Sequence, residues 1–104
     1  MRIVHGPAVF EELLNISAYI AFDNEPVAQH FLDACDETFR FLAVHPNIGV
    51  ARSFRKRELR EVRMWRVKGF EKYLVFYCPI PEGLKILHVV YSARDYRRLF
   101  DDET

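Results

Sequence analysis

The chain has 104 residues, half of them hydrophobic, and its formal net charge is zero. This length supports one hydrophobic core rather than two, so we expect a single domain over residues 1–104. The apolar content excludes an intrinsically disordered chain, and no apolar run approaches the roughly 20 residues that would span a bilayer.

The N-terminal part predicts a strand followed by a helix. Residues 2–5 contain two β-branched side chains and end at Gly6–Pro7, which is typical of a strand leading into a helix that begins with proline. Apolar residues then recur at helical spacing up to about Phe22, and Val9 and Ile16 widen their face. That face consists of Phe10, Leu13, Leu14, Ser17, Ile20 and Ala21.

A second helix follows the segment DNEP at 23–26, which offers a capping residue and a proline for the first helical turn. The helix should end at His45–Pro46. Its apolar stripe consists of Val27, Phe31, Ala34, Cys35, Thr38 and Leu42, with Phe39 and Phe41 beside them. The connection between the two helices is so short that we expect an antiparallel hairpin.

Three strands are predicted after an exposed basic connection at 50–58. They cover about 60–67, 73–79 and 84–91, with turns at 68–71 and 79–83. This order of elements predicts an α+β fold, in which a small antiparallel sheet with an N-terminal strand carries the two-helix hairpin on one face. The residues expected in its core are Leu13, Ile20, Phe31, Leu42, Val75, Ile86 and Val89.

The charges are divided unevenly along the chain. Residues 1–46 carry 2 Lys/Arg against 7 Asp/Glu, and residues 47–104 carry 13 against 8, so the neutral total hides halves of −5 and +5. Between Arg52 and Lys72, nine Lys or Arg are interleaved with aromatic side chains that include Trp65. Such a cluster suits a nucleic-acid backbone with stacked bases, or an acidic protein segment anchored by the aromatics. A solvated strand face is the third interpretation.

No pattern in the sequence assigns a catalytic group, a metal site or a cofactor. The four histidines form no pair at ligand spacing, no glycine-rich phosphate loop exists, and no serine comes with a recognisable base. His88 lies in the most apolar strand, where a buried structural role is expected. Cys35 and Cys78 are predicted to be buried free thiols in a reducing cytoplasm.

A set of short segments carries a family resemblance. They are AYI at 18–20, DNEP at 23–26, AVHPNIG at 43–49, LR at 59–60, MWRVKGF at 64–70, YLVFY at 73–77 and VVYSARD at 89–95. In their order and spacing they resemble the RelE/ParE superfamily of type II toxins over nearly the full length of the chain. The resemblance implies the same order of strand, helical hairpin and antiparallel strands, and a toxin that a small antitoxin holds inactive.

The superfamily divides into RelE-like ribonucleases, which cut mRNA on the ribosome, and ParE-like toxins, which are associated with inhibition of DNA gyrase. The ribonuclease branch carries an Arg where this chain has Leu74, and a Tyr where the nearest match is Phe100. Without these groups a site should stabilise the transition state of strand cleavage poorly. The chain therefore resembles the ParE-like branch of plasmid stabilisation proteins. A ribonuclease using Tyr91 or Tyr96, and an inactive antitoxin-binding descendant, stay open as alternatives.

The resemblance implies two partners, a cognate antitoxin encoded nearby and DNA gyrase as the target. We expect the antitoxin to contact the cationic and aromatic cluster Arg60, Arg63, Trp65, Arg66 and Phe70. We expect the target to contact the polar C-terminal segment, because a short terminal segment can carry activity without carrying the fold. The residues predicted for that contact are Arg94, Arg97 and Arg98.

Overall fold

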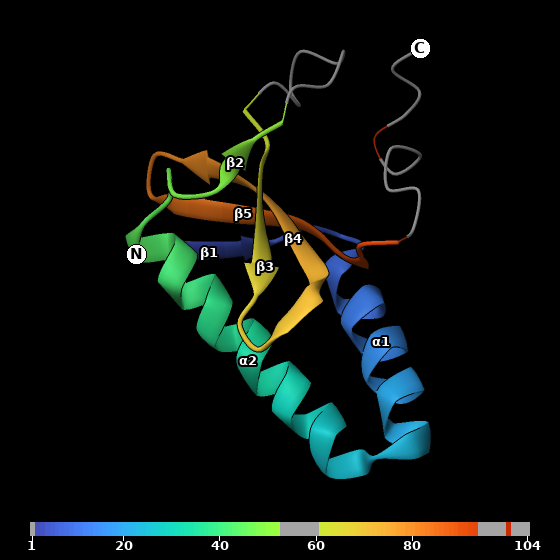
Figure 1. Ribbon diagram of the computed structural model, residues 1–104. Helices are drawn as coiled ribbons and strands as arrows, with labels where there is room; N and C mark the ends of the chain where they lie inside the picture. Colours follow the sequence, from blue (N-terminus) through green and yellow to red (C-terminus); the bar gives the residue numbers. More distant parts are fainter. Residues whose placement is uncertain (1, 53–60, 94–99, 101–104) are drawn as a thin grey trace.

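The computed structural model describes residues 2–52, 61–93 and 100, and it joins a helical hairpin to a five-stranded sheet (Figure 1). Its elements, in chain order, are β1 (Arg2–His5), α1 (Val9–Asp23), α2 (Glu25–Val44), β2 (Val50–Ala51), β3 (Arg63–Val67), β4 (Phe70–Ile80) and β5 (Gly83–Tyr91). No helix within these ranges is long and apolar enough to cross a membrane.

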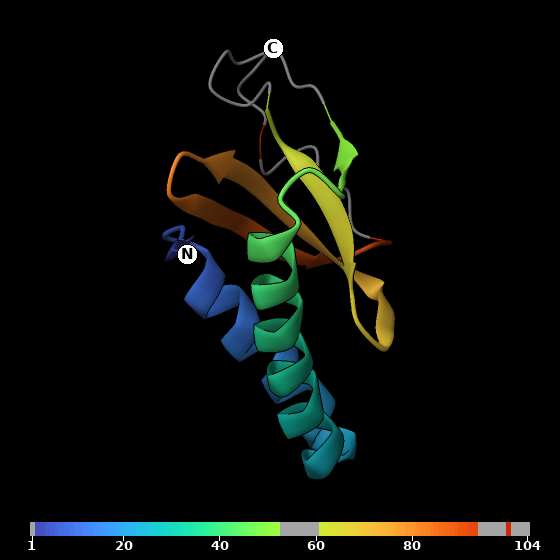
Figure 2. The same cartoon turned by 90° about the vertical axis from the view of Figure 1, so that its left-hand side faces the viewer.

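Both helices lie on the same face of the sheet, which confirms the predicted α+β fold (Figures 1 and 2). The strand order is β1-β5-β4-β3-β2. Strands β2 to β5 pair antiparallel, whereas β1 runs parallel to β5, so the sheet is mixed. The helical hairpin and three further strands separate β1 from β5 in the sequence. In the sheet the two strands are neighbours and run in the same direction.

The connection between β3 and β4 is tighter than the sequence suggested. The two strands are joined by Lys68–Gly69 alone, and Gly69 has a φ of 80°, which favours glycine. Phe70, expected in the turn, begins β4 instead. The short strand β2 was not predicted, and residues 53–58 of the expected basic connection lie outside the described residues.

The main core lies between the helical hairpin and the sheet. Five of the predicted core residues are buried, namely Phe31, Leu42, Val75, Ile86 and Val89. Leu13 and Ile20 pack against the same core but stay partly exposed, so their predicted burial is only partial. A smaller apolar cluster covers the opposite face of the sheet and consists of Val62, Leu74, Phe76, Val90 and Phe100.

Helix α1 is rotated from its predicted orientation. The residues that pack on the core are Val9, Leu13, Ile16 and Ile20. Phe10 and Leu14, which were expected on the same face, are 73% and 55% exposed. Both sets recur at helical spacing, so periodicity alone does not tell which stripe the sheet will cover.

The chain after α2 is fixed by two side chains of the sheet. The hydroxyl of Tyr77 donates to the carbonyl oxygen of Pro46 at 2.9 Å and accepts from the backbone nitrogen of Gly49 at 3.0 Å. A Cβ added at Gly49 would lie 2.6 Å from that hydroxyl, so this close approach requires glycine. Arg63 donates to the carbonyl oxygens of Asn47 and Gly49 at 3.1 and 2.7 Å.

The two cysteines are free thiols, as predicted, but they differ in burial. Cys35 is buried in α2, whereas Cys78 is only half-buried in β4. Burial, and then the charge of the adjacent Asp36, raise the pKa of the Cys35 thiol to about 12. Cys35 therefore stays protonated at neutral pH and is a poor nucleophile.

Candidate partner-binding surface

The structure describes four of the five residues predicted to bind a protein partner. Arg63, Trp65 and Arg66 lie on β3, and Phe70 begins β4. The other positions lie outside the described residues, and these are Arg60 and the predicted target-binding residues Arg94, Arg97 and Arg98.

The alternation of β3 separates the four side chains rather than gathering them. Trp65 pairs with Val75 and packs against the core beneath the helices. Arg66 pairs with Leu74, which belongs to the apolar cluster on the opposite face. Phe70 packs edge-on against a ring of α2, with 5.2 Å between the ring centroids. Trp65 and Phe70 therefore share one side of the sheet. Arg66 alternates toward the other side, is exposed, and still borders the groove that Trp65 lines.

Arg63 is engaged within the fold. Its guanidinium is part-buried and bonds the two loop carbonyl groups described above. These bonds place it with the residues that hold the loop after α2. The four described residues thus divide into an aromatic pair, one solvent-facing arginine and one arginine that supports the loop.

Trp65 lines a groove between α2 and the β3–β4 turn, which we call the Trp65 groove. Its volume is about 380 Å³, and its lining residues are Glu37, Thr38, Phe41, Trp65, Arg66, Val67, Lys68, Gly69 and Glu71. The rings of Trp65 and Phe41 stack at 6.2 Å between centroids with 29° between their planes. Phe41 is 40% exposed, so this stack presents an apolar surface to solvent. The sequence had placed Phe41 only beside a core stripe.

The outer edge of β3 opens into this groove. Strand β2 pairs only with Arg63 and Met64, so in the described part of the chain the stretch from Trp65 to Val67 pairs with β4 on one side and with no strand on its outer side. An extended segment of another protein could add to such an edge through main-chain hydrogen bonds, with side chains entering the groove.

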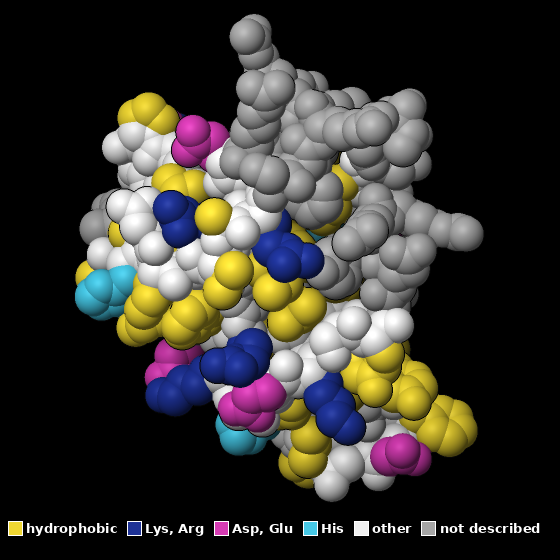
Figure 3. Space-filling model, turned by 45° about the horizontal axis from the view of Figure 1, so that its top comes forward, with side chains coloured by type: hydrophobic (Ala, Val, Ile, Leu, Met, Phe, Trp, Pro, Cys, Tyr) yellow, Lys and Arg dark blue, Asp and Glu magenta, His cyan; other side chains and the backbone are white. Residues whose placement is uncertain are grey.

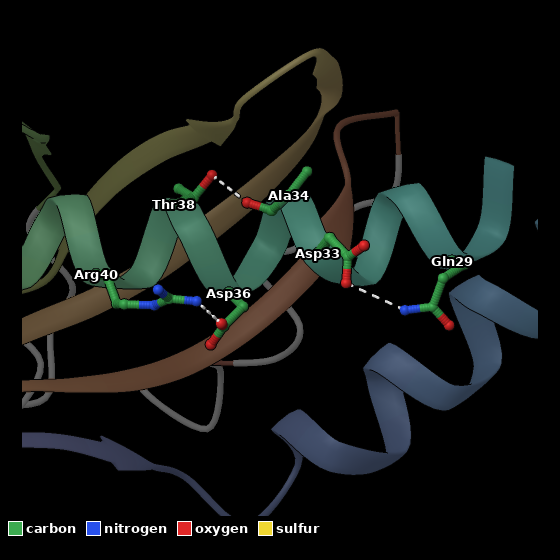
Figure 4. Close-up of polar contacts among 6 residues, drawn as sticks. All are labelled: Gln29, Asp33, Ala34, Asp36, Thr38 and Arg40. Atoms are coloured by element: carbon green, nitrogen blue, oxygen red, sulfur yellow. Dashed lines mark hydrogen bonds and ion pairs between the residues drawn. The ribbon is translucent and has the colours of Figure 1, made fainter. Parts of the chain in front are cut away.

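Thr38 fixes the wall of the groove. Its buried hydroxyl donates to the carbonyl oxygen of Ala34 at 2.7 Å (Figure 4). The same hydroxyl accepts from the backbone nitrogen of Lys68 at 3.0 Å. This second bond joins α2 to the β3–β4 turn. The hydroxyl is therefore satisfied both as a donor and as an acceptor, and it links two walls of the groove.

The groove carries charges of both signs. The ammonium of Lys68 lies 3.5 Å from the carboxylate of Glu37, and Glu71 also lines the groove. Figure 3 shows Lys and Arg side chains among hydrophobic ones, with some carboxylates beside them. The exposed side of α2 has further local pairs, Asp36 with Arg40 and Gln29 with Asp33 (Figure 4). The described part of the predicted cationic surface is thus an apolar groove with a mixed rim.

The positions that separate the two superfamily branches are both buried. Leu74 is 8% exposed and Phe100 is 3% exposed, and both belong to the apolar cluster on the face of the sheet opposite the helices. Phe100 meets the rings of Phe76 and His88 edge-on at 5.3 and 5.2 Å. Neither position offers a charged or phenolic group to a phosphate.

His88 makes contacts within the fold, as expected from the sequence, but it is only partly buried rather than fully buried. Its Nδ1 atom lies 2.6 Å from the carboxylate of Glu12, and its side chain is 16% exposed. The same carboxylate accepts a hydrogen bond from the backbone nitrogen of Val89 at 2.9 Å. Because β1 ends at His5, this N–H belongs to a part of β5 that β1 does not reach. Glu12, in the first turns of α1, therefore supplies the hydrogen-bond acceptor that a neighbouring strand would otherwise give to the Val89 N–H.

Within the described ranges, no group of three or more His, Cys, Asp or Glu side chains is placed to hold a metal ion.

A family model described as "ParE toxin of type II toxin-antitoxin system, parDE" matches residues 5–96. A search of the curated proteins found no match to this chain. The family match spans both helices, the Trp65 groove and all of β5.

Proposed function

This chain belongs to the ParE toxin family of type II toxin–antitoxin systems, and on that premise we propose that it inhibits DNA gyrase and is neutralised by a tightly bound antitoxin encoded nearby. A toxin of this class needs a surface that its antitoxin can occupy. The observation that carries the proposal for that surface is the open edge of β3 beside the stacked rings of Trp65 and Phe41.

The proposed antitoxin contact is strand addition to β3, with an apolar side chain seated in the Trp65 groove. Main-chain bonds to a strand edge supply affinity, and the groove supplies specificity. Aromatic anchors in a desolvated pocket dominate such interfaces, so Trp65 and Phe41 are the proposed anchors, with Phe70 behind them. Arg66 and Arg60 are proposed as rim charges that speed association with an acidic segment.

The proposed gyrase contact is the cationic C-terminal segment with Arg94, Arg97 and Arg98. It follows β5 directly in the sequence, and a short polar terminal segment can carry activity without carrying the fold. Replacing Arg97 and Arg98 together by Ala should leave the melting temperature and antitoxin binding nearly unchanged while weakening growth arrest. A double variant as toxic as the wild type would move the gyrase contact elsewhere, most naturally to residues 52–72.

The proposal is tested first in cells. The chain is expressed alone and together with each neighbouring reading frame, and growth, DNA breaks and mRNA ends are followed after induction. We expect growth arrest with broken DNA and uncut mRNA, and relief by one neighbouring product. Discrete mRNA cuts within minutes would replace gyrase by the ribosome as the target. Growth without arrest would favour an inactive antitoxin-binding descendant.

The antitoxin surface is tested with the purified complex. Trp65→Ala should raise the dissociation rate by about 10- to 100-fold, the range expected for loss of an aromatic anchor. Arg66→Ala should instead lower the association rate and its dependence on salt. Phe22→Ala is the matched control, because Phe22 is 92% exposed at the end of α1 and lines neither groove nor core. Equal dissociation rates for the Trp65 and Phe22 variants would refute this surface.

A further inference from the structure

A second hollow lies beside β4, next to the residues that form the Trp65 groove. Its volume is about 520 Å³, and its lining residues are Asn15, Ile16, Tyr19, Lys72, Tyr73 and Tyr91. We call it the tyrosine hollow. Residues 68, 69 and 71 line the Trp65 groove and residues 72 and 73 line the tyrosine hollow, so the chain that leads from the β3–β4 turn into β4 borders both sites.

The floor of the hollow is made of packed aromatic rings, and its rim is exposed to solvent. Tyr73 and Tyr91 pair across β4 and β5, with 5.4 Å between their ring centroids. Behind Tyr73, the ring of Phe31 from the buried core makes an edge contact at 5.1 Å. Tyr19 comes from α1 and is 77% exposed, and Tyr91 is 43% exposed. The rings of Tyr19, Tyr73 and Tyr91, from α1, β4 and β5, thus line the hollow, and Tyr73 at its floor packs on the core.

The polar groups of the hollow favour an occupant with hydrogen-bond acceptors. Its lining contains one cationic residue, Lys72, and no carboxylate. Burial, and then the neighbouring phenols of Tyr19 and Tyr91, raise the pKa of Tyr73, so its hydroxyl stays protonated and can donate at neutral pH. An apolar wall, phenolic donors and an ammonium together suit a hydrophobic side chain that has a carboxylate next to it.

We propose that the tyrosine hollow is a second anchor site for the antitoxin, which takes a hydrophobic side chain flanked by an acidic residue from the same segment that occupies the Trp65 groove. This inference rests on the proposed function. One chain crossing β4 would fill both sites, and the second contact would form at a high effective concentration. Joining two such contacts can exceed the affinity of either by about 10²- to 10⁴-fold without a new interaction.

The test uses Tyr19→Ala and Tyr91→Ala, singly and together, since both side chains are exposed. Tyr73 is left intact because it packs on the core. The probe is the protein product of the adjacent reading frame that relieves growth arrest. The double variant should raise its dissociation rate by about 10- to 100-fold. Tyr19→Phe with Tyr91→Phe, which keeps the rings and removes the hydroxyls, should have a smaller effect, and Phe22→Ala should have none.

Overlapping peptides of that antitoxin separate the two anchors. Some peptides should respond only to Trp65→Ala, the adjacent ones only to the tyrosine variants, and a peptide that covers both should respond to each. If the antitoxin binds and responds to Trp65→Ala but ignores the tyrosine variants, this inference is overturned while the proposed function stands. If the wild-type chain binds no neighbouring product, both are overturned.

Two other occupants would also overturn the inference. Single-stranded DNA could stack its bases on the tyrosines, and a second copy of the chain could cover them. Binding of a labelled oligonucleotide, or self-association measured by light scattering, would then change in the double tyrosine variant while the antitoxin dissociation rate stayed at the wild-type value.

Discussion

Arg63 donates a hydrogen bond to the carbonyl oxygen of Gly49 across 2.7 Å, and this contact ties β3 to the loop that follows α2. The loop leads directly into β2, which ends after two residues and leaves the rest of the β3 edge open. Arg63 therefore helps to set where the proposed antitoxin edge begins. An arginine that its charge alone would assign to a partner thus also holds a loop of the fold.

We predict that Arg63→Ala destabilises the fold and that Arg66→Ala does not. Hydrogen bonds to a charged group contribute about 1.5–3 kcal/mol, so Arg63→Ala should lower the free energy of unfolding by an amount in that range. Arg66 is exposed and should change it by less than about 0.5 kcal/mol. Urea unfolding followed by circular dichroism measures both. Equal midpoints for the two variants would remove the structural role of Arg63.

A second matched pair lies in the first turns of α1. Glu12→Ala removes the acceptor of the Val89 N–H and the partner of His88, whereas Glu11→Ala removes an exposed neighbouring carboxylate. A buried donor left without a partner costs about 1–3 kcal/mol, so only the Glu12 variant should show a loss of that size. Hydrogen exchange should also show faster exchange of the Val89 amide in that variant. Unchanged protection of this amide would contradict the role of Glu12 as its acceptor.

Core packing is tested by Ile86→Ala against Phe10→Ala. Ile86 is fully buried between the sheet and the helices, so its truncation should cost about 2–5 kcal/mol. Phe10 is 73% exposed, and its loss should cost far less although its side chain is larger. Thermal melts of the two variants check the orientation of α1. A greater loss for Phe10→Ala would mean that the other stripe of the helix faces the sheet.

The stability of the fold at alkaline pH should depend on Cys35. Its thiol pKa is raised from 9.0 to about 12 by burial, so the unfolded chain releases this proton at lower pH than the folded chain. The protonated Cys35 thiol therefore contributes its full share to the free energy of unfolding below pH 9. This share is lost as the pH rises toward 12, and the free energy of unfolding falls by at most about 1.4 kcal/mol per pH unit. Cys35→Ala should lose stability less steeply over this range. Parallel curves for the two proteins would contradict the assignment.

The sequence was sufficient for the helical hairpin and the three C-terminal strands, because each has a clear period and clear turn residues. The sequence did not show which face of α1 packs on the sheet. The pair Phe10 and Leu14 has the same spacing as the pair Val9 and Leu13, and only the packing of the helix on the sheet places the second pair, rather than the first, against the core. The parallel pairing of β1 also depends on tertiary structure. The sequence of a short strand does not show which strand it will pair with. Strand β2 has only two residues, too few for a recognisable period, and was not predicted.

The candidate site was predictable only in part. Trp65 and Phe70 stand out in sequence as aromatics among cations, and the structure places them on one side of the sheet. Phe41 and Thr38 come from α2 and reach the groove only through the packing of the hairpin on the sheet. The functions of Arg63 and Glu12 depend on loop carbonyls and on an unpaired strand edge, and neither feature is visible from residue types.

The central claim is that this toxin acts on gyrase and that its antitoxin relieves the action. The most direct measurement is supercoiling of relaxed plasmid by purified gyrase, with the purified chain added alone and then with a molar excess of the neighbouring gene product. We predict dose-dependent inhibition by the chain and recovery of supercoiling when the partner is present. Full supercoiling at every concentration of a chain that still arrests growth would contradict the claim.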